Sequence, residues 1–430
     1  MSTKQRIVIV GGGIAGLALS TQLGKRLGRS GKAEITLLDR NSAHVWKPML
    51  HTFAAGTANS YQQRISFVAQ AARCSFRFLP GAMQHVDIQA RELLVSPIIS
   101  ARGEKVLGER TIGYDTLFLA AGSKANDFGT PGVGQYCFFI DDLQQAEAFN
   151  DGLYAGLLRT AALDEPLTIA IVGGGATGVE LAAEISQLLD VASSYGTGDL
   201  RPRLALTLIE SSPRILAAFP EEVAEAATQQ LRALGIDIRT GVRVVAADAT
   251  GLELNDGSRI DASLRVWAAG VKAPDAVAGL QGFDLTPAGQ VKVHENLQST
   301  TDERVFALGD CASLTPAGAS RPLPPTAQVA RQQAMHLARH VPGWLEDQSI
   351  PAFVVRDLGS LVSLSRYNAF GTLGRHGLFR NRFIRGRFAQ LSHALLYRLH
   401  QAELHGLGRA GLIWLSDAIA ATVRPRIRVD

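Results

Sequence analysis

Apolar and polar residues alternate along the chain in a way that predicts short buried strands separated by helices. Residues 7–10 are four consecutive β-branched residues, a run typical of a strand buried inside a parallel sheet. A glycine-rich turn follows, and Leu17, Leu19 and Leu23 begin the pattern of an amphipathic helix. The next apolar run, residues 35–38, predicts a second strand. The start of the chain therefore predicts a βαβ unit.

The chain repeats this pattern after about 160 residues. Residues 168–178 restate the strand and glycine turn of residues 6–16, and residues 206–210 restate residues 35–39. Two copies of the pattern predict two Rossmann-like modules in an α/β protein, and hence two bound dinucleotides, one of them FAD and the other a nicotinamide dinucleotide.

Each half continues in the same way. Short alternating strands are expected within residues 86–95 and 242–254, and closing apolar runs at 114–122 and 264–270. Another apolar run, residues 299–310, is expected to return the chain to the first module and to make that domain discontinuous. The predicted domains are residues 1–128 and 273–350 for the first, 129–272 for the second, and 351–430 for a C-terminal region of strands and amphipathic helices.

The glycine spacing explains why a dinucleotide is expected. Gly11, Gly13 and Gly16 have G-x-G-x-x-G spacing, which provides a tight turn, close approach of the backbone to a pyrophosphate, and close packing of helix on strand. The N-terminus of the following helix offers free N–H groups to the anion. Asp39 ends the next strand 23 residues beyond Gly16, about where a carboxylate binds a ribose.

The second module has its acidic residue later, because a loop at residues 190–203 lengthens the unit. Glu210 lies 32 residues beyond Gly178. A carboxylate at this strand end accepts a hydrogen bond from a ribose 2′-hydroxyl and repels a 2′-phosphate, which favours NADH over NADPH. Arg214 lies close by in the sequence and weakens that preference.

A helix is expected after the prolines at 322–325. Gln328 and Gln332 lie one turn apart on one face of it. Paired amides near a flavin could bind a carbonyl substrate; a solvated helix face is the alternative, and the spacing alone favours it. Asp310 follows another apolar strand and is placed to meet a ribityl hydroxyl or to cap a helix.

The C-terminal region differs from the rest in charge. The whole chain has a net charge of +4, whereas residues 375–430 hold ten arginines and three acidic residues. Two helical stretches there have apolar faces, which suits helices lying in a membrane interface next to anionic lipid. The alternative is a helical hairpin that packs on the body or forms a homodimer contact. No run of 18 uncharged apolar residues predicts a membrane-spanning helix, and the arginines do not line a groove for nucleic acid.

The cysteines limit the chemistry. Cys74, Cys137 and Cys311 are scattered and odd in number, which predicts free thiols in a reducing compartment. No zinc-type spacing occurs, so no metal is expected. Disulfide reductases with two dinucleotides need a cysteine pair just after the first module, and no cysteine lies between Gly16 and Cys74.

These motifs together resemble the type II NADH dehydrogenases, which are FAD-containing, non-proton-pumping NADH:quinone oxidoreductases of the inner membrane. The resemblance runs the full length and is close to the proteobacterial branch. Thr52 is a departure, because the family usually has glutamate there. Besides the two glycine motifs, the segments that carry the resemblance are residues 44–51 (His-Val-Trp-Lys-Pro-Met-Leu-His), 54–56, 306–310, 327–332 and 357–365.

The resemblance implies roles for individual residues. Quinone would lie beside Gln328 and Gln332, Lys47 would stabilise reduced flavin, and Glu180 would lie near nicotinamide and flavin, stabilised as a carboxylate by the helix dipole. His336 is a candidate proton donor to the quinone. The residues implied for FAD are Gly11, Gly13, Gly16, Asp39, Arg40, Lys47, Ala121, Gly122, Gly309, Asp310, Ala327 and Gln328. Those implied for NADH are Gly173, Gly175, Gly178, Glu180, Glu210, Ala269 and Gly270.

The implied activity is transfer of two electrons from NADH through FAD to a membrane quinone, at the cytoplasmic face of the bacterial inner membrane. Three alternatives share part of the pattern. A sulfide:quinone oxidoreductase would need cysteines at the flavin, for which only Cys137 and Cys311 remain. A reductase with a soluble acceptor would not need residues 375–430. An NADH-sensing interaction protein would bind both cofactors but turn over slowly.

Overall fold

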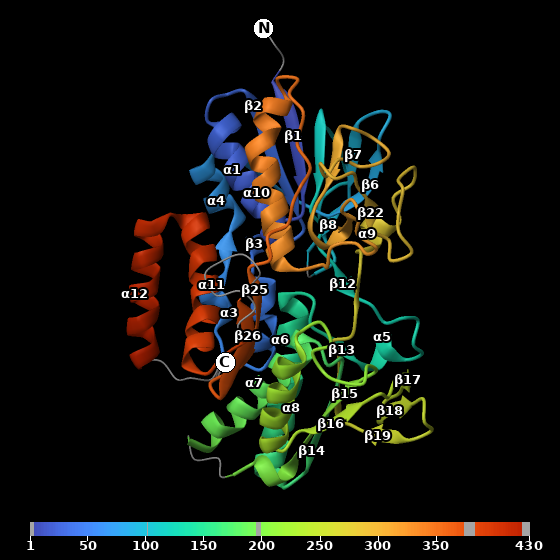
Figure 1. The fold of residues 1–430 in the computed structure, drawn as a ribbon, viewed down its shortest axis with the longest axis vertical. Coiled ribbons are helices and arrows are strands. Elements are labelled where there is room, and N and C mark those ends of the chain that lie inside the picture. The colour runs from blue at the N-terminus through green and yellow to red at the C-terminus, as the bar shows by residue number, and fades with distance from the viewer. Residues whose placement is uncertain (1–3, 101, 195–198, 374–382, 424–430) are drawn as a thin grey trace. The chain divides into compact units, whose positions relative to one another are not determined.

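A computed structural model of the chain describes residues 4–100, 102–194, 199–373 and 383–423 (Figure 1). These residues form two compact units, and both units are discontinuous in sequence. The first unit combines Met1–Lys47, Gln63–Lys124 and Val271–Val355, and the second combines Pro48–Gln62, Ala125–Gly270 and Arg356–Asp430.

The first unit is built on a five-stranded parallel sheet with the order β23-β11-β1-β2-β5. The first βαβ unit is present as predicted, because β1 and β2 pair in parallel and the glycine turn follows β1. Strand β23, from late in the chain, pairs with β11 and joins the same sheet. The strands are β1 Gln5–Val10, β2 Ala33–Asp39, β5 Arg77–Pro80, β11 Thr116–Leu119 and β23 Val305–Ala307.

Two helices lie side by side on this sheet, α1 (Ile14–Leu23) and α10 (Ala327–Trp344) (Figure 1). The prediction that the first helix is amphipathic is wrong, since eight of the ten residues of α1 are buried. The reason is that α10 covers the face that a two-layer fold would leave in water. The helix predicted after the prolines is α10, and the Thr326 side chain caps it by accepting the Val329 N–H.

Smaller elements complete the first unit. The alternating strands expected at 86–95 form an antiparallel sheet with the order β10-β7-β6. Helix α4 packs against β5 and α1. These elements are α4 Phe67–Cys74, β6 Met83–Asp87, β7 Glu92–Val95 and β10 Arg110–Gly113.

The second unit contains the second module as predicted, a parallel sheet with the order β13-β20-β14-β15-β16. Helix α7 follows the glycine turn after β14 and contacts both β14 and β15. The elements are β13 Phe138–Phe139, β14 Leu167–Val172, β15 Leu204–Glu210, β16 Asp237–Thr240, β20 Leu264–Trp267, α2 Leu50–Ala54, α5 Val133–Tyr136, α6 Leu143–Leu163, α7 Ala176–Ala192 and α8 Glu221–Ala233.

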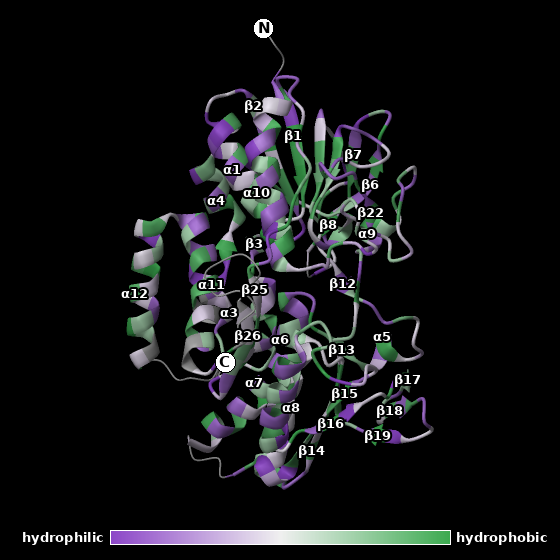
Figure 2. Cartoon of the chain, viewed as in Figure 1, coloured by the Kyte–Doolittle hydropathy of each residue, from purple (hydrophilic) through white to green (hydrophobic). Residues whose placement is uncertain are grey.

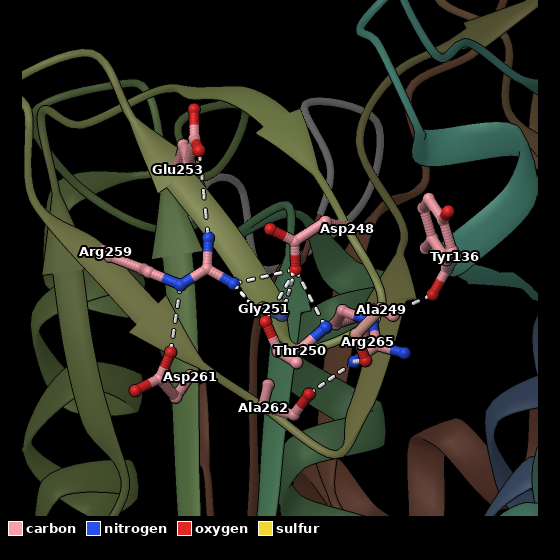
Figure 3. A network of polar contacts seen from close by, with 10 residues as sticks. All are labelled: Tyr136, Asp248, Ala249, Thr250, Gly251, Glu253, Arg259, Asp261, Ala262 and Arg265. Atoms are coloured by element: carbon pink, nitrogen blue, oxygen red, sulfur yellow. Dashed lines mark hydrogen bonds and ion pairs between the residues drawn. The ribbon is translucent and has the colours of Figure 1, made fainter.

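Two arginines organise the small antiparallel sheet of this unit, β17 (Val244–Ala247), β18 (Gly251–Leu254) and β19 (Arg259–Asp261) (Figure 3). Arg259 reaches three carboxylates at the surface, where ion pairs contribute little to stability. Arg265 is only 8% exposed, and its guanidinium donates to backbone carbonyls of Tyr136, Ala249 and Ala262. It therefore ties the sheet to β20 and to the end of α5.

The C-terminal region belongs to the second unit. An antiparallel hairpin, β25 (Gly359–Leu364) and β26 (Asn368–Leu373), contacts both α7 and α11 (Arg387–His405). Helix α12 (Leu407–Val423) packs on α11, so both predicted helices are present. Residues 375–382 and 424–430, which belong to the predicted basic segment, lie outside the described residues.

Polar groups join the helices α11 and α12. Arg398 pairs with Asp417 at 2.5 Å, and the Gln401 carbonyl accepts the Trp414 indole N–H at 3.1 Å. Large apolar side chains of both helices are exposed, and Figure 2 shows hydrophobic colours along α12. They are Leu391, Leu395, Leu396, Leu399, Leu407, Leu412, Leu415, Ile419 and Val423. In the described part of the chain, no helix is long and apolar enough to cross a membrane.

Candidate functional site

The glycine turn of the first unit is closed on one side and open on the other. A Cβ on Gly16 would lie 1.8 Å from the Gly11 carbonyl oxygen, so only glycine allows α1 to pack this closely on β1. A Cβ on Gly11 would overlap the backbone of Ala120 and Ala121, which places Ala121 beside the turn. Gly13, at the start of α1, has no protein atom within 4 Å of its Cβ position. The free N–H groups of α1 therefore face open space in which an anion could bind.

Asp39 holds this turn from the end of β2. Its carboxylate accepts the Gly12 N–H at 2.6 Å and the Asn41 N–H at 2.7 Å. Burial raises its pKa, while these two bonds and the positive charge of Arg40 act in the opposite direction. Each carboxylate oxygen has a second lone pair, so Asp39 can still accept a ribose hydroxyl.

His44 holds the same turn, and sequence reasoning missed this role. Its Nδ1 donates to the Gly12 carbonyl at 2.9 Å, and burial lowers the pKa of the ring to about 4, which keeps it neutral. The Phe67 ring occupies the space where a Gly12 side chain would lie. No spacing rule in the sequence indicates these contacts, because His44 and Phe67 lie far beyond the glycine motif.

Three of the predicted residues, Lys47, Gly122 and Asp310, lie close together around Ser123. The Ser123 hydroxyl donates to the Asp310 carboxylate at 2.8 Å, and the Lys47 ammonium donates to the Ser123 carbonyl at 2.9 Å. Gly122 precedes Ser123, so the end of β11 reaches Asp310 directly. Asp310 therefore meets a side chain from another segment. It lies inside a short 3-10 turn, Gly309–Cys311, which has no side-chain cap, so the cap interpretation finds no support here and the ribityl contact stays a prediction.

Helix α10 begins beside Asp310. The Gln333 amide oxygen accepts the Gly309 N–H at 2.7 Å, which fixes the start of the helix against the end of β23. Gln328 and Gln332 lie on successive turns of α10, both partly buried, and Ala327 is its first residue. The structure therefore brings the predicted amides to the same end of the unit as Asp310.

The surroundings of His336, the candidate proton donor, favour a neutral ring. Its Nε2 lies 2.9 Å from the Pro351 carbonyl, to which a ring N–H can donate. Burial lowers the pKa of the ring, so it is neutral at pH 7.

The glycine turn of the second unit is closed on one side and open on the other, like that of the first unit. A Cβ on Gly178 would lie 2.0 Å from the Gly173 carbonyl oxygen, whereas Gly175 has nothing within 4 Å. A Cβ on Gly173 would overlap the backbone of Ala269. Gly270 has a left-handed backbone, with φ 64°. The end of β20 therefore closes this turn as the end of β11 closes the first.

Glu210 takes the place of Asp39 in this unit. Its carboxylate accepts the N–H groups of Gly174 and Ser212, each at 2.7 Å. Arg214 donates to the carbonyls of Leu216 and Phe219 and closes its own loop. Its guanidinium is therefore already engaged, which removes the main objection to NADH as the preferred dinucleotide.

Glu180 differs from the prediction. A carboxylate stabilised by the helix dipole was expected, but the side chain is buried and lies against His51 of α2 and Ser363 of β25. Burial raises its pKa to about 8, so the group is neutral at pH 7. Desolvation outweighs the helix dipole because the dipole effect amounts to about 1 kcal/mol.

Neither of the remaining cysteines has the properties of a reactive thiolate. Burial raises the pKa of Cys311 and of Cys137 to about 11. The Thr52 hydroxyl donates to the Met49 carbonyl at 2.7 Å. Within the described ranges, no three histidine, cysteine or acidic side chains gather as metal ligands.

Comparison with known proteins gives consistent matches. Residues 5–334 match the family model "Pyridine nucleotide-disulphide oxidoreductase". The type II NADH:quinone oxidoreductase of Haemophilus influenzae is 36% identical, over 99% of this chain and 100% of that protein. The structure of NDH2 from Plasmodium falciparum in complex with NADH has a TM-score of 0.84 at 18% identity, covering 99% and 100% of the two chains. The sulfide:quinone oxidoreductase from Aquifex aeolicus has a TM-score of 0.74 at 18% identity, covering 99% and 98%.

Proposed function

This chain belongs to the type II NADH:quinone oxidoreductases, within the pyridine nucleotide-disulphide oxidoreductases, and on this premise we propose that FAD binds its first unit and NADH its second. The protein transfers electrons from NADH to a quinone. The observation that supports the two sites is their repeated construction. In each unit, an acidic residue at a strand end and a closed glycine turn leave the N-terminus of a helix open.

The residues of the first unit fit FAD. The open N–H groups of α1 suit the pyrophosphate, and Asp39 suits the adenine ribose. Asp310, fixed by Ser123, suits a ribityl hydroxyl, and Lys47 supplies a positive charge that would stabilise reduced flavin. When bound, FAD supplies the two-electron carrier between a hydride donor and the quinone.

NADH fits the second unit for the same reasons. The open side at Gly175 suits the pyrophosphate, and Glu210 suits the ribose 2′-hydroxyl.

Glu210→Ala is expected to raise the KM for NADH about tenfold, because one charge-assisted hydrogen bond to the ribose is lost. The same change should improve the use of NADPH relative to NADH by at least about tenfold, since the carboxylate no longer repels the 2′-phosphate. Steady-state kinetics with both cofactors measure the ratio. Glu222→Ala, on α8 (Glu221–Ala233), is the matched control. An unchanged ratio in Glu210→Ala would contradict the ribose assignment.

Gln328 and Gln332 are the proposed quinone ligands. Their side chains share one partly buried face of α10 and can donate to two carbonyl oxygens. This face begins beside Asp310, at the FAD site of the same unit.

The exposed apolar row of α11 and α12 is the proposed membrane contact, at the cytoplasmic face of the inner membrane. Apolar helix faces with arginine and tryptophan beside them bind the lipid interface. Leu395→Glu with Leu399→Glu is expected to reduce sedimentation with anionic vesicles at least about fivefold. Tyr154→Glu with Leu158→Glu, at similarly exposed positions of α6, adds the same charge elsewhere and should bind like wild type. Equal loss in both double variants would contradict the assignment.

The overall proposal is tested by following the flavin of detergent-purified protein without oxygen. NADH should bleach it rapidly, and a ubiquinone analogue should then restore the absorbance rapidly. Bleaching by sulfide but not by NADH would indicate a sulfide:quinone oxidoreductase. Bleaching without recovery would contradict quinone as the acceptor.

A further inference from the structure

One face of α7 carries a line of polar residues although the rest of the helix is mostly apolar and largely buried. Glu180, Glu184, Gln187 and Asp190 follow one another at spacings of three or four residues, so they lie along one side of the helix. Most buried helix faces of this length are apolar, because each buried polar group must find a partner. The partners of this line therefore indicate what it does.

The two ends of the line have different partners. Asp190 binds the guanidinium groups of Arg201 and Arg366 and the Tyr367 hydroxyl, which fixes the hairpin β25–β26 to α7. At the other end, Glu180 accepts the Ser363 N–H at 3.0 Å and has no arginine partner among its described contacts. The ion pairs that attach the hairpin to α7 therefore lie at Asp190, almost three turns from Glu180.

Glu180 lies between two titratable neighbours. Its Oε2 is 3.4 Å from Nδ1 of His51, and the two side chains are 9% and 5% exposed. Glu184 lies one turn further along, and its carboxylate accepts the Thr57 hydroxyl at 2.5 Å. Burial raises the pKa of both glutamates, and Glu184 raises that of Glu180 further.

The other elements packed on α7 add little charge near Glu180. These elements are α2, β25, β14 and β15. Strand β14 has no ionisable residue, and β15 has only Glu210, which is bonded to the Gly174 N–H. Burial therefore sets the direction of the pKa shift of Glu180, and His51 and Glu184 are the ionisable neighbours on these elements that modify it.

We propose that His51 and Glu184 are positioning residues of the NADH site, acting in opposite directions on the charge of Glu180. Burial is the main cause that keeps the Glu180 carboxyl group neutral, and the charge of an ionised Glu184 adds to it by like-charge repulsion. His51, whose Nδ1 is 3.4 Å from Oε2, favours the ionised form. Glu180 lies two residues beyond Gly178, close to the helix N-terminus at which the pyrophosphate is placed. An ionised Glu180 therefore repels the anionic dinucleotide, and a neutral one does not. The inference rests on the proposed placement of NADH in the second unit.

The consequence is an alkaline limit on NADH binding. Glu180 releases its proton as the pH rises through about 8, and the site then gains a negative charge. The apparent affinity for NADH is expected to fall about tenfold above this limit. Glu180→Gln, which stays neutral, should remove this fall.

The experiment measures how the rate of flavin bleaching depends on NADH concentration, from pH 6 to 9.5, in FAD-loaded protein without oxygen. Glu184→Gln should move the alkaline limit to lower pH, and His51→Phe should move it to higher pH, each by about one unit. His51→Gln keeps a hydrogen-bond donor and should restore a limit near that of wild type. Ser186→Ala, on the same helix, is the control and should leave it in place.

The proposal requires the alkaline limit to move in opposite directions in Glu184→Gln and His51→Phe, because a general loosening of the helix would move it in the same direction in both. Shifts of the same sign, or no shift in either variant, would overturn the proposal. If His51→Phe does not fold, His51→Asn replaces it, since its shorter side chain loses the contact and should also raise the limit. Absence of bleaching at every pH in wild type would instead overturn the assignment of NADH as the donor.

Discussion

Gly175→Val is expected to raise the KM for NADH about a hundredfold while the protein keeps its fold and its FAD. The position has a φ of −73° and a ψ of −177°, which valine adopts without strain, and no protein atom lies within 4 Å of the new Cβ. The branched side chain would therefore fill only the space proposed for the pyrophosphate. It would also keep the anion away from the N–H groups of α7.

The control for this prediction is Gly134→Val in α5, in the same unit. Its Cβ also enters open space, but no cofactor is assigned there. FAD content, the unfolding temperature and the KM for NADH should be close to wild type in Gly134→Val, and only the KM should change in Gly175→Val. A near-normal KM in Gly175→Val would show that the dinucleotide does not approach this turn.

The features that could be predicted from the sequence are local. Each set of parallel strand, glycine turn and acidic strand end lies within about 45 residues, and the physical reason for each residue is contained in that segment. Asp39 and Glu210 therefore lie beside their glycine turns at the strand ends, where the spacing predicts ribose-binding carboxylates; their bonds to the turns themselves were not predicted. The C-terminal helices were predicted for the same reason, because their periodicity lies within single segments.

The features that could not be predicted depend on contacts between distant segments. His44 and Gln333 hold the first site through backbone groups, and no pattern in the sequence indicates which ones. The amphipathic pattern assigned to α1 fails because a helix 300 residues later covers it. Glu180 was expected to be charged from its place in the helix alone. Burial between α7, α2 and β25, segments far apart in the sequence, raises its pKa instead.

Gln328→Ala is expected to slow the recovery of flavin absorbance with quinone about tenfold while bleaching by NADH keeps its wild-type rate. One hydrogen bond to a quinone carbonyl is lost, and the second unit is untouched. Gln332→Ala should behave in the same way. The double variant should lose less than the product of the two effects, because both amides would bind one molecule. The two half-reactions are followed separately in the anaerobic experiment.

Gln333→Leu provides the contrast, because this neighbouring amide lies on the buried face of the same helix. It accepts the Gly309 N–H, so its loss leaves that donor buried without a partner beside Asp310. We expect Gln333→Leu to lose FAD during purification, whereas Gln328→Ala and Gln332→Ala should retain it. Equal slowing of both half-reactions in Gln328→Ala, with FAD retained, would contradict a quinone site on this face. Slow recovery with quinone in the Gln328 and Gln332 variants, together with loss of FAD in Gln333→Leu, would indicate that one face of α10 binds the substrate and the other supports the cofactor site.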